Sequence, residues 1–205
     1  MLIILKNKDT LIFDEFKFRC CIGKNGFSKK KVEGDKKTPT GLFSLGHLYY
    51  RADKKEKPDT KLKTIKILNN MGWCNDSSSR EFYNKIINTR LKVRHEKLRR
   101  NDFKYDYFLH IKYNWKKIKL GIGSAIFIHL TKDYSPTAGC IGISEKDFLI
   151  LIKLINKKTK MGIGSAIFIH LTKDYSPTAG CIGISEKDFL ILIKLINKNT
   201  KIKIL

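Results

Sequence analysis

Apolar and polar positions alternate along the first part of the chain in short segments typical of β-strands. The segments 2–5, 10–13 and 17–22 are rich in β-branched and aromatic residues, and polar turns separate them. Several glycines and Pro39 interrupt the pattern that follows, and such residues mark turns and loops. The first fifty residues therefore predict an antiparallel meander without a helix.

The strand pattern weakens in the middle of the chain and returns near residue 107. The segment 51–106 is charged and rich in turn residues, with a modest helical tendency at 80–100, so we expect a long elaboration over the sheet. Further strands are predicted at 107–112, 124–130 and 140–143, with a loop between the last two.

One amphipathic helix is predicted to begin after Ser144. Ser144 can accept a hydrogen bond from the third helical position, Asp147, as an N-cap residue does. Apolar residues then recur at the helical period on one face; they are Phe148, Leu151, Ile152 and Ile155. The expected fold class is mostly β, a β-sandwich or partly open barrel, with one packed helix.

Residues 121–157 recur without a single change at 162–198. Repeats of solenoid proteins keep mainly their buried pattern and stack in three or more units, whereas here the polar positions are identical too. We interpret the repeat as a tandem duplication of a strand-loop-helix segment inside one domain.

The 205-residue chain is long enough for a single buried core even without its second copy. The predicted organisation is one domain at 1–160, followed at 161–200 by a spare or exchanged copy of 120–159. The alternating end KIKIL at 201–205 is a candidate for the terminal strand of that domain.

The formal net charge is +23 at pH 7, which suits an anionic partner such as nucleic acid, a membrane surface or an anionic wall polymer. The basic residues are spread along the chain and do not cluster on one element with aromatic residues, so we expect no nucleic-acid partner. No run approaches 18 apolar residues, and Lys6 and Lys8 come too early for a signal-peptide core. We therefore expect no transmembrane segment and, for the sequence as written, a cytoplasmic location.

Cysteine spacing predicts free thiols and no metal site, because none of the cysteines forms a C-x-x-C pair. Adjacent strand residues face opposite ways, and Cys20 and Cys21 are expected to be buried packing residues. His95-Glu96 lacks the second His of a zinc-protease helix, and we expect a charged surface there. The five cysteines are Cys20, Cys21, Cys74, Cys140 and Cys181.

His129 and Cys140, eleven positions apart, form the candidate reactive pair. A cysteine attacks as its thiolate, and a nearby imidazole withdraws the proton and, once charged, lowers the pKa of the thiol. Gly139 lets the backbone turn sharply, and the amides of Gly139 and Cys140 can point at a developing oxyanion. The residues alone fit a strand-end His and a buried structural Cys as well. The corresponding residues of the second copy are His170, Gly180 and Cys181.

Three segments extend this pattern into a recognisable signature. GSAIFIH at 123–129 ends in a His, PTAGCI at 136–141 follows after a loop, and EGDKKTPTGLF at 33–43 holds a Gly-Asp-x-x-Thr-Pro turn. Together they resemble the L,D-transpeptidase catalytic domain, or YkuD-type, family over nearly all of 1–157. Further similar positions, typical of a signal-less bacterial branch, are Trp73, Tyr83, Asn84, Tyr113 and Asn114.

The resemblance implies peptidoglycan L,D-transpeptidation without a cofactor. Cys140 would attack the carbonyl between the third residue of a peptidoglycan stem peptide and D-Ala, with His129 as proton acceptor and donor and Gly139 as oxyanion donor. An amine or water would then resolve the thioester. The family also implies a cell-envelope location.

Two departures from the family pattern keep alternatives open. Many members have His before the Gly-Cys pair and Arg two residues after the Cys, where this chain has Ala138 and Gly142. One alternative is a cytosolic cysteine hydrolase or acyltransferase acting on another amide. The other is a catalytically inactive basic binding module.

The repeat permits three His/Cys pairs, since the working site can draw on either copy. The pairs are His129 with Cys140, His129 with Cys181, and His170 with Cys181. Insertions are best tolerated at exposed loops between elements, so we expect the extra segment to leave the domain after the helix. That exit keeps His129 with Cys140.

Overall fold

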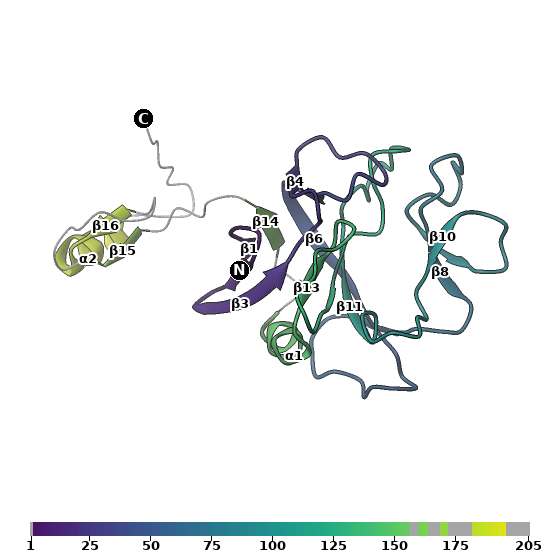
Figure 1. Ribbon diagram of the computed structural model, residues 1–205. Coiled ribbons are helices and arrows are strands. Elements are labelled where there is room, and N and C mark those ends of the chain that lie inside the picture. The colour runs from purple at the N-terminus through teal and green to yellow at the C-terminus, as the bar shows by residue number, and fades with distance from the viewer. Residues whose placement is uncertain (1, 156–159, 164–168, 172–181, 196–205) are drawn as a thin grey trace. The chain divides into compact units, whose positions relative to one another are not determined.

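The computed structural model describes residues 2–155, 160–163, 169–171 and 182–195 (Figure 1). The chain divides into two compact units, Met1–Gly164 and Ser165–Leu205.

The N-terminal strands form the expected meander. Strands β1 (Leu2–Leu5), β2 (Thr10–Phe13) and β3 (Phe16–Cys21) pair antiparallel in chain order. Their alternation buries one set of side chains, among them Ile3, Leu5, Leu11 and Phe13. This prediction is confirmed.

The described residues of the first unit build one long, curled sheet. Its strand order is β11 (Tyr107–Ile111), β12 (Phe127–Leu130), β13 (Ile141–Ile143), β3, β2, β1, β14 (Lys160–Ile163), β6 (Leu42–Tyr50) and β7 (Thr64–Lys66). Because β11 pairs with both β12 and β6, the sheet curls back on itself. The predicted mostly β fold, a partly open barrel with one packed helix, is confirmed.

Two smaller sheets come from the connections of the first unit. Strand β4 (Phe27–Ser28) pairs with β5 (Thr38–Pro39), and β8 (Met71–Cys74) lies between β9 (Ile86–Asn88) and β10 (His95–Lys97). The helix considered at 80–100 is therefore absent from the structure, and that prediction was wrong. Asn84 has a φ of 57°, which a right-handed helix excludes, and β9 buries only its middle residue, Ile87.

The helix α1 (Glu145–Leu154) has the predicted start and face. Ser144 has extended backbone, and its side chain accepts a hydrogen bond of 3.1 Å from the amide of Asp147. Phe148, Leu151 and Ile152 are fully buried against the sheet. Among the described segments, no helix is long and apolar enough to cross a membrane.

The strand predicted at 124–130 is shorter than expected. It begins only at Phe127, because Gly123 and Ala125 have φ values of 102° and 52°. A non-glycine residue with positive φ breaks an extended strand. The chain thus enters β12 through a tight bend, which lies beside the candidate site.

The second unit repeats the local elements of the first copy. Strands β15 (Ile169–Leu171) and β16 (Ile182–Ile184) pair parallel with Ile169 opposite Ile182, as Ile128 lies opposite Ile141 in the first copy. Helix α2 (Glu186–Leu195) follows. The end KIKIL at 201–205 lies outside the described residues, and the strand that pairs with β1 and β6 is β14.

Candidate active site

Strand alternation brings His129 and Cys140 to the same face of the sheet. In the parallel pair of β12 and β13, Ile128 lies opposite Ile141 and His129 opposite Gly142. Ile128 and Ile141 both point into the main core, which the curled sheet forms with α1. Because neighbouring strand residues face opposite ways, His129 and Cys140 turn to the other face.

That other face carries a second core, here called the aromatic cluster. It packs between β11, β12 and the small sheet of β8 to β10, and Cys140 is one of its members. The cluster consists of Tyr49, Ile67, Trp73, Leu98, Tyr105, Phe108, Phe127 and Cys140. The candidate nucleophile therefore lies where apolar packing ends and a cleft begins.

Hydrogen bonding fixes the tautomer of His129. Its Nδ1 lies 2.9 Å from the carbonyl oxygen of Leu130, and a carbonyl oxygen only accepts, so Nδ1 carries the proton. The lone pair of the neutral ring is then on Nε2. Burial lowers the pKa of His129 to about 4, so the ring is neutral at pH 7 and its Nε2 can accept a proton.

Cys140 is a neutral thiol in this structure. The residue is 8% exposed, and its Sγ donates to the carbonyl oxygen of Ala125 at 3.2 Å. Burial, together with the nearby charge of Glu96, raises the pKa of the thiol to about 12. The expectation of a thiol pKa lowered by His129 is therefore wrong for the resting site, because a neutral imidazole supplies no positive charge.

The turn before Cys140 requires a glycine. Gly139 has a φ of 132°, and a Cβ there would lie 2.8 Å from the carbonyl oxygen of Lys37. The carbonyl of Gly139 accepts from the hydroxyl of Thr38 at 3.0 Å, so the Thr-Pro turn at 33–43 braces the loop that carries Cys140.

The amide of Gly139 is engaged in this structure. It donates to Oγ1 of Thr137 at 3.1 Å, whereas no hydrogen bond within the described part of the chain uses the amide of Cys140. The predicted oxyanion role of Gly139 stays a prediction, and the Cys140 amide is the donor that is available at rest.

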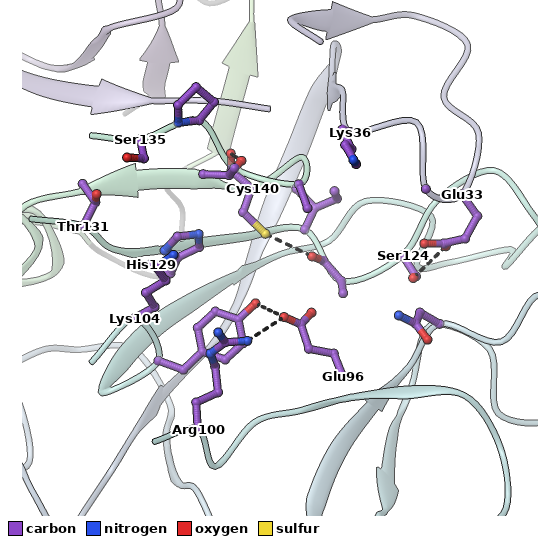
Figure 2. Close-up of a pocket in the computed structure, with 18 of the residues that line it drawn as sticks. Glu33, Lys36, Glu96, Arg100, Lys104, Ser124, His129, Thr131, Ser135 and Cys140 are labelled. Carbon is purple, nitrogen blue, oxygen red and sulfur yellow. Dashed lines mark hydrogen bonds and ion pairs between the residues drawn. The ribbon is translucent and has the colours of Figure 1, made fainter. Parts of the chain in front are cut away.

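A cleft of about 380 Å³ opens over these groups (Figure 2). His129 and Cys140 both line it, and it carries charges of both signs. The cationic side chains are Lys31, Lys36, Arg100 and Lys104, and the acidic ones are Glu33, Glu96 and Asp133. A polar, mixed-charge cleft over a buried thiol suits a substrate that has charged groups beside the reacting carbonyl.

Lys31 is the most enclosed of the cations. It is 6% exposed, its Nζ pairs with Asp35 at 2.5 Å, and its stem lies against Gly123, where a Cβ would meet Cε at 2.8 Å. Nothing in the local sequence distinguishes Lys31 from its neighbours Lys29 and Lys30, so its place in the cleft could not be predicted.

Asn84 and Tyr83 hold the backbone bend at 123–125, whose Ala125 carbonyl accepts a hydrogen bond from the Cys140 thiol. Oδ1 of Asn84 accepts from the amide of Ala125 at 3.1 Å and from Nε1 of Trp73 at 2.9 Å. The hydroxyl of Tyr83 accepts from the amide of Gly123 at 3.0 Å. These contacts explain the bend before β12. They also give a structural role to Trp73, Tyr83 and Asn84, three of the positions that resemble the family.

Glu96 enters the cleft from β10 and lines it together with Cys140 (Figure 2). Its Oε1 accepts from the hydroxyl of Tyr105 at 2.6 Å and lies 3.7 Å from the guanidinium of Arg100. We expected His95-Glu96 to be a charged surface, and the Glu96 side chain is half-buried, 28% exposed, and lines the cleft. Glu96 and Tyr105 lie nine residues apart in an irregular segment, and no periodicity marks them.

Gly142 is matched to Cys21 of the neighbouring strand β3. A Cβ at position 142 would lie 2.6 Å from Sγ of Cys21 and 3.2 Å from Cβ of Thr131. A larger residue there, such as the Arg of many family members, requires a smaller residue at position 21. The glycine at position 142, where many family members have Arg, is therefore matched by the packing of Cys21 against it.

The remaining sequence candidates belong to the second copy. His170 lies in β15 of the second unit, and Gly180 and Cys181 lie outside the described residues. The four cysteines that the structure describes are all free, as predicted, and all buried; they are Cys20, Cys21, Cys74 and Cys140. No group of metal-ligating side chains occurs within the described ranges.

A curled, mostly β domain with a thiol and an imidazole in one cleft has the architecture of a thiol-dependent acyl-transfer enzyme. The model of the L,D-transpeptidase catalytic domain family (YkuD) matches residues 2–163. The chain therefore belongs to this family, whose members have L,D-transpeptidase-type activity on peptidoglycan. A search of curated proteins and a search of solved structures found no match.

Proposed function

We propose that the protein is a cysteine acyltransferase that cleaves the bond before the terminal D-Ala of a peptidoglycan stem peptide, with Cys140 as the nucleophile and His129 as the base. The observation that carries this proposal is the single cleft that both side chains line. The hydrogen bond to Leu130 supports it, because it leaves Nε2 of His129 free to accept a proton.

In the first half of the reaction the thiol gives its proton to Nε2 of His129 as the sulfur attacks the carbonyl. The C–N bond to D-Ala breaks, and the imidazolium returns the proton to the departing amine. The oxyanion accepts a hydrogen bond from the amide of Cys140, joined by Gly139 if Thr137 releases that amide.

A neutral thiol at Cys140 and a neutral imidazole at His129 suit this scheme, because the thiolate and the imidazolium form only during the reaction. A resting pair of thiol and imidazole transfers its proton when the substrate displaces the contact between Cys140 and Ala125. The thioester is then resolved by an amine, which gives transpeptidation, or by water, which gives hydrolysis.

A second candidate is acyl transfer or hydrolysis at an amide of a different compound. Ala138 and Gly142 stand where many family members carry His and Arg, and Cys21 fills the space beside Gly142. A substrate that needs those two side chains would bind poorly.

Release of D-Ala tests the proposal and separates the two candidates. The protein is incubated with a stem tetrapeptide ending in D-Ala, and free D-Ala is quantified. We expect release by the parent and by Cys181→Ala, and loss of release in Cys140→Ala. Cys181→Ala is a matched control because its sequence neighbours are identical. No release by a folded parent protein would reject the tetrapeptide as substrate and favour the second candidate.

A further inference from the structure

Resolution of the thioester by an amine needs one more proton acceptor than resolution by water. A primary alkylamine is protonated at pH 7, and R–NH₃⁺ must lose two protons to become an amide N–H. Water loses only one proton before the sulfur leaves. His129 can accept one proton and pass it to the departing sulfur, so the other proton of the ammonium needs a second base.

We infer that Glu96 is this second base, and that it selects an amine over water as the acceptor of the acyl group. The inference rests on the proposed function. In the step itself, a carboxylate oxygen of Glu96 takes one proton from the ammonium, and the neutral nitrogen attacks the thioester carbonyl. His129 takes the second proton, the C–S bond breaks, and His129 returns that proton to the sulfur of Cys140.

The position of Glu96 supports this role. Its side chain is 28% exposed and lines the same cleft as Cys140 and His129. Oε1 is occupied by the hydroxyl of Tyr105 at 2.6 Å, but no donor among the described residues bonds to Oε2. Oε2 is not fully buried, so it is open to the cleft and can accept a charge-assisted hydrogen bond from an incoming ammonium.

The charge of Glu96 is only weakly compensated by Arg100. The guanidinium of Arg100 is held by both carboxylate oxygens of Asp102, at 2.9 and 2.6 Å, and reaches Glu96 only at 3.7 Å. Burial raises the pKa of Glu96, which makes its carboxylate a better proton acceptor near neutral pH. The other charged and titratable groups that act on Glu96 are Tyr105, Asp102, Glu33 and Cys140.

The other acids of the cleft are less suited to the task. Oε2 of Glu33 already accepts from the hydroxyls of Tyr83 at 2.6 Å and Ser124 at 2.8 Å. Asp133 lies at the exposed mouth, where Ser135 donates to it at 2.6 Å. Asp133 therefore offers a control carboxylate in the same cleft.

The test compares two amine acceptors on Glu96→Gln and on the control Asp133→Asn. Each protein is acylated with the stem tetrapeptide in the presence of Nα-acetyl-lysinamide, whose ε-amine is protonated at pH 7, or of hydroxylamine, which is mostly neutral there. Mass spectrometry then quantifies the transfer product and the hydrolysis product, and the readout is their ratio.

For Glu96→Gln we expect the transfer-to-hydrolysis ratio with lysinamide to fall at least about tenfold. The ratio with hydroxylamine should stay unchanged, because that amine enters without the extra proton, and Asp133→Asn should match the parent with both. Acyl-enzyme formation by Glu96→Gln serves as the folding control. If that variant does not fold, Glu96→Asp, which withdraws the carboxylate from the cleft, should show the same selective loss.

Three results would overturn the inference. An unchanged lysinamide ratio in an acylated Glu96→Gln protein would reject the role of Glu96 and leave the proposed function intact. An equal loss with both amines would show general damage to the cleft. A parent protein that forms no acyl-enzyme would reject the proposed function as well.

Discussion

Cys140 should react very slowly with iodoacetamide in the resting protein, although His129 shares its cleft. Only the thiolate is alkylated. With a pKa of about 12, about one molecule in 10⁵ carries the thiolate at pH 7, against about 3% for an ordinary cysteine with a pKa near 8.5. Alkylation of Cys140 should therefore be on the order of 10³-fold slower than in the urea-unfolded chain.

Glu96→Gln should speed up this alkylation. The carboxylate is the first charge that raises the pKa of Cys140, and Gln removes the charge while it keeps an acceptor for the Tyr105 hydroxyl. The same variant slows amine transfer in the scheme above, so the two assays should move in opposite directions. A general loss of structure does not predict that pattern.

The assay needs a Cys181→Ala background. Trypsin cuts after Lys132 and Lys146, and the repeat makes the resulting peptide identical to the one that contains Cys181. With Cys181 removed, the mass of the modified peptide reports on Cys140 alone, and its rate is followed from pH 6 to 10. Rapid alkylation at pH 7, with a midpoint below 8.5, would refute the neutral resting pair.

Three further predictions concern stability. Gly142→Ala should lower the unfolding free energy by about 1–3 kcal/mol through overpacking, because its Cβ would lie 2.6 Å from Sγ of Cys21. Adding Cys21→Ala should recover most of this loss in urea titrations. A double variant as unstable as Gly142→Ala alone would show that Cys21 is not the cause. Ser144→Ala should lower the unfolding free energy by about 1 kcal/mol through loss of the N-cap, and circular dichroism melting can check this. Burial lowers the pKa of His129 from 6.5 to about 4, so the unfolded chain binds the proton first, and stability should be lost as pH falls from 6.5 towards 4, by up to about 1.4 kcal/mol per pH unit. His129→Gln should remove this part of the slope, and an unchanged slope would contradict the assignment.

The sequence pattern was sufficient to predict an element where the apolar and polar residues of that element alone determine its structure. The meander of β1 to β3 and the helix after Ser144 follow from apolar spacing and one capping side chain, and both were predictable. The chemical pair His129 and Cys140 could also be selected, because the residues around it resemble a family signature.

Elements that depend on distant partners could not be predicted in the same way. Gly121 and Ile122 lie in a turn, with φ of 75° at Gly121, whereas the same dipeptide at 162–163 belongs to strand β14. The sequence is identical, and only the neighbouring strands β1 and β6 make the second one extended. Local propensity is therefore a weak guide there.

One supporting side chain of the site was missed for a related reason. Glu96 comes from the irregular connection between β7 and β11, where no periodicity indicates which residues face the cleft. Only the pairing of β10 with β8 places it in the cleft that Cys140 lines. The resting protonation of the thiol also depends on burial, which the aromatic cluster creates.

An intact-mass measurement of the acyl-enzyme decides whether Cys140 is the nucleophile. Four proteins are each incubated with the stem tetrapeptide and quenched in acid: the parent, Cys140→Ala, Cys181→Ala and the double variant. Mass spectrometry then gives the intact mass of each. We expect one added acyl group, with loss of D-Ala, on the parent and on Cys181→Ala, and no adduct on Cys140→Ala or on the double variant. An adduct that persists in Cys140→Ala and disappears in Cys181→Ala would contradict this expectation.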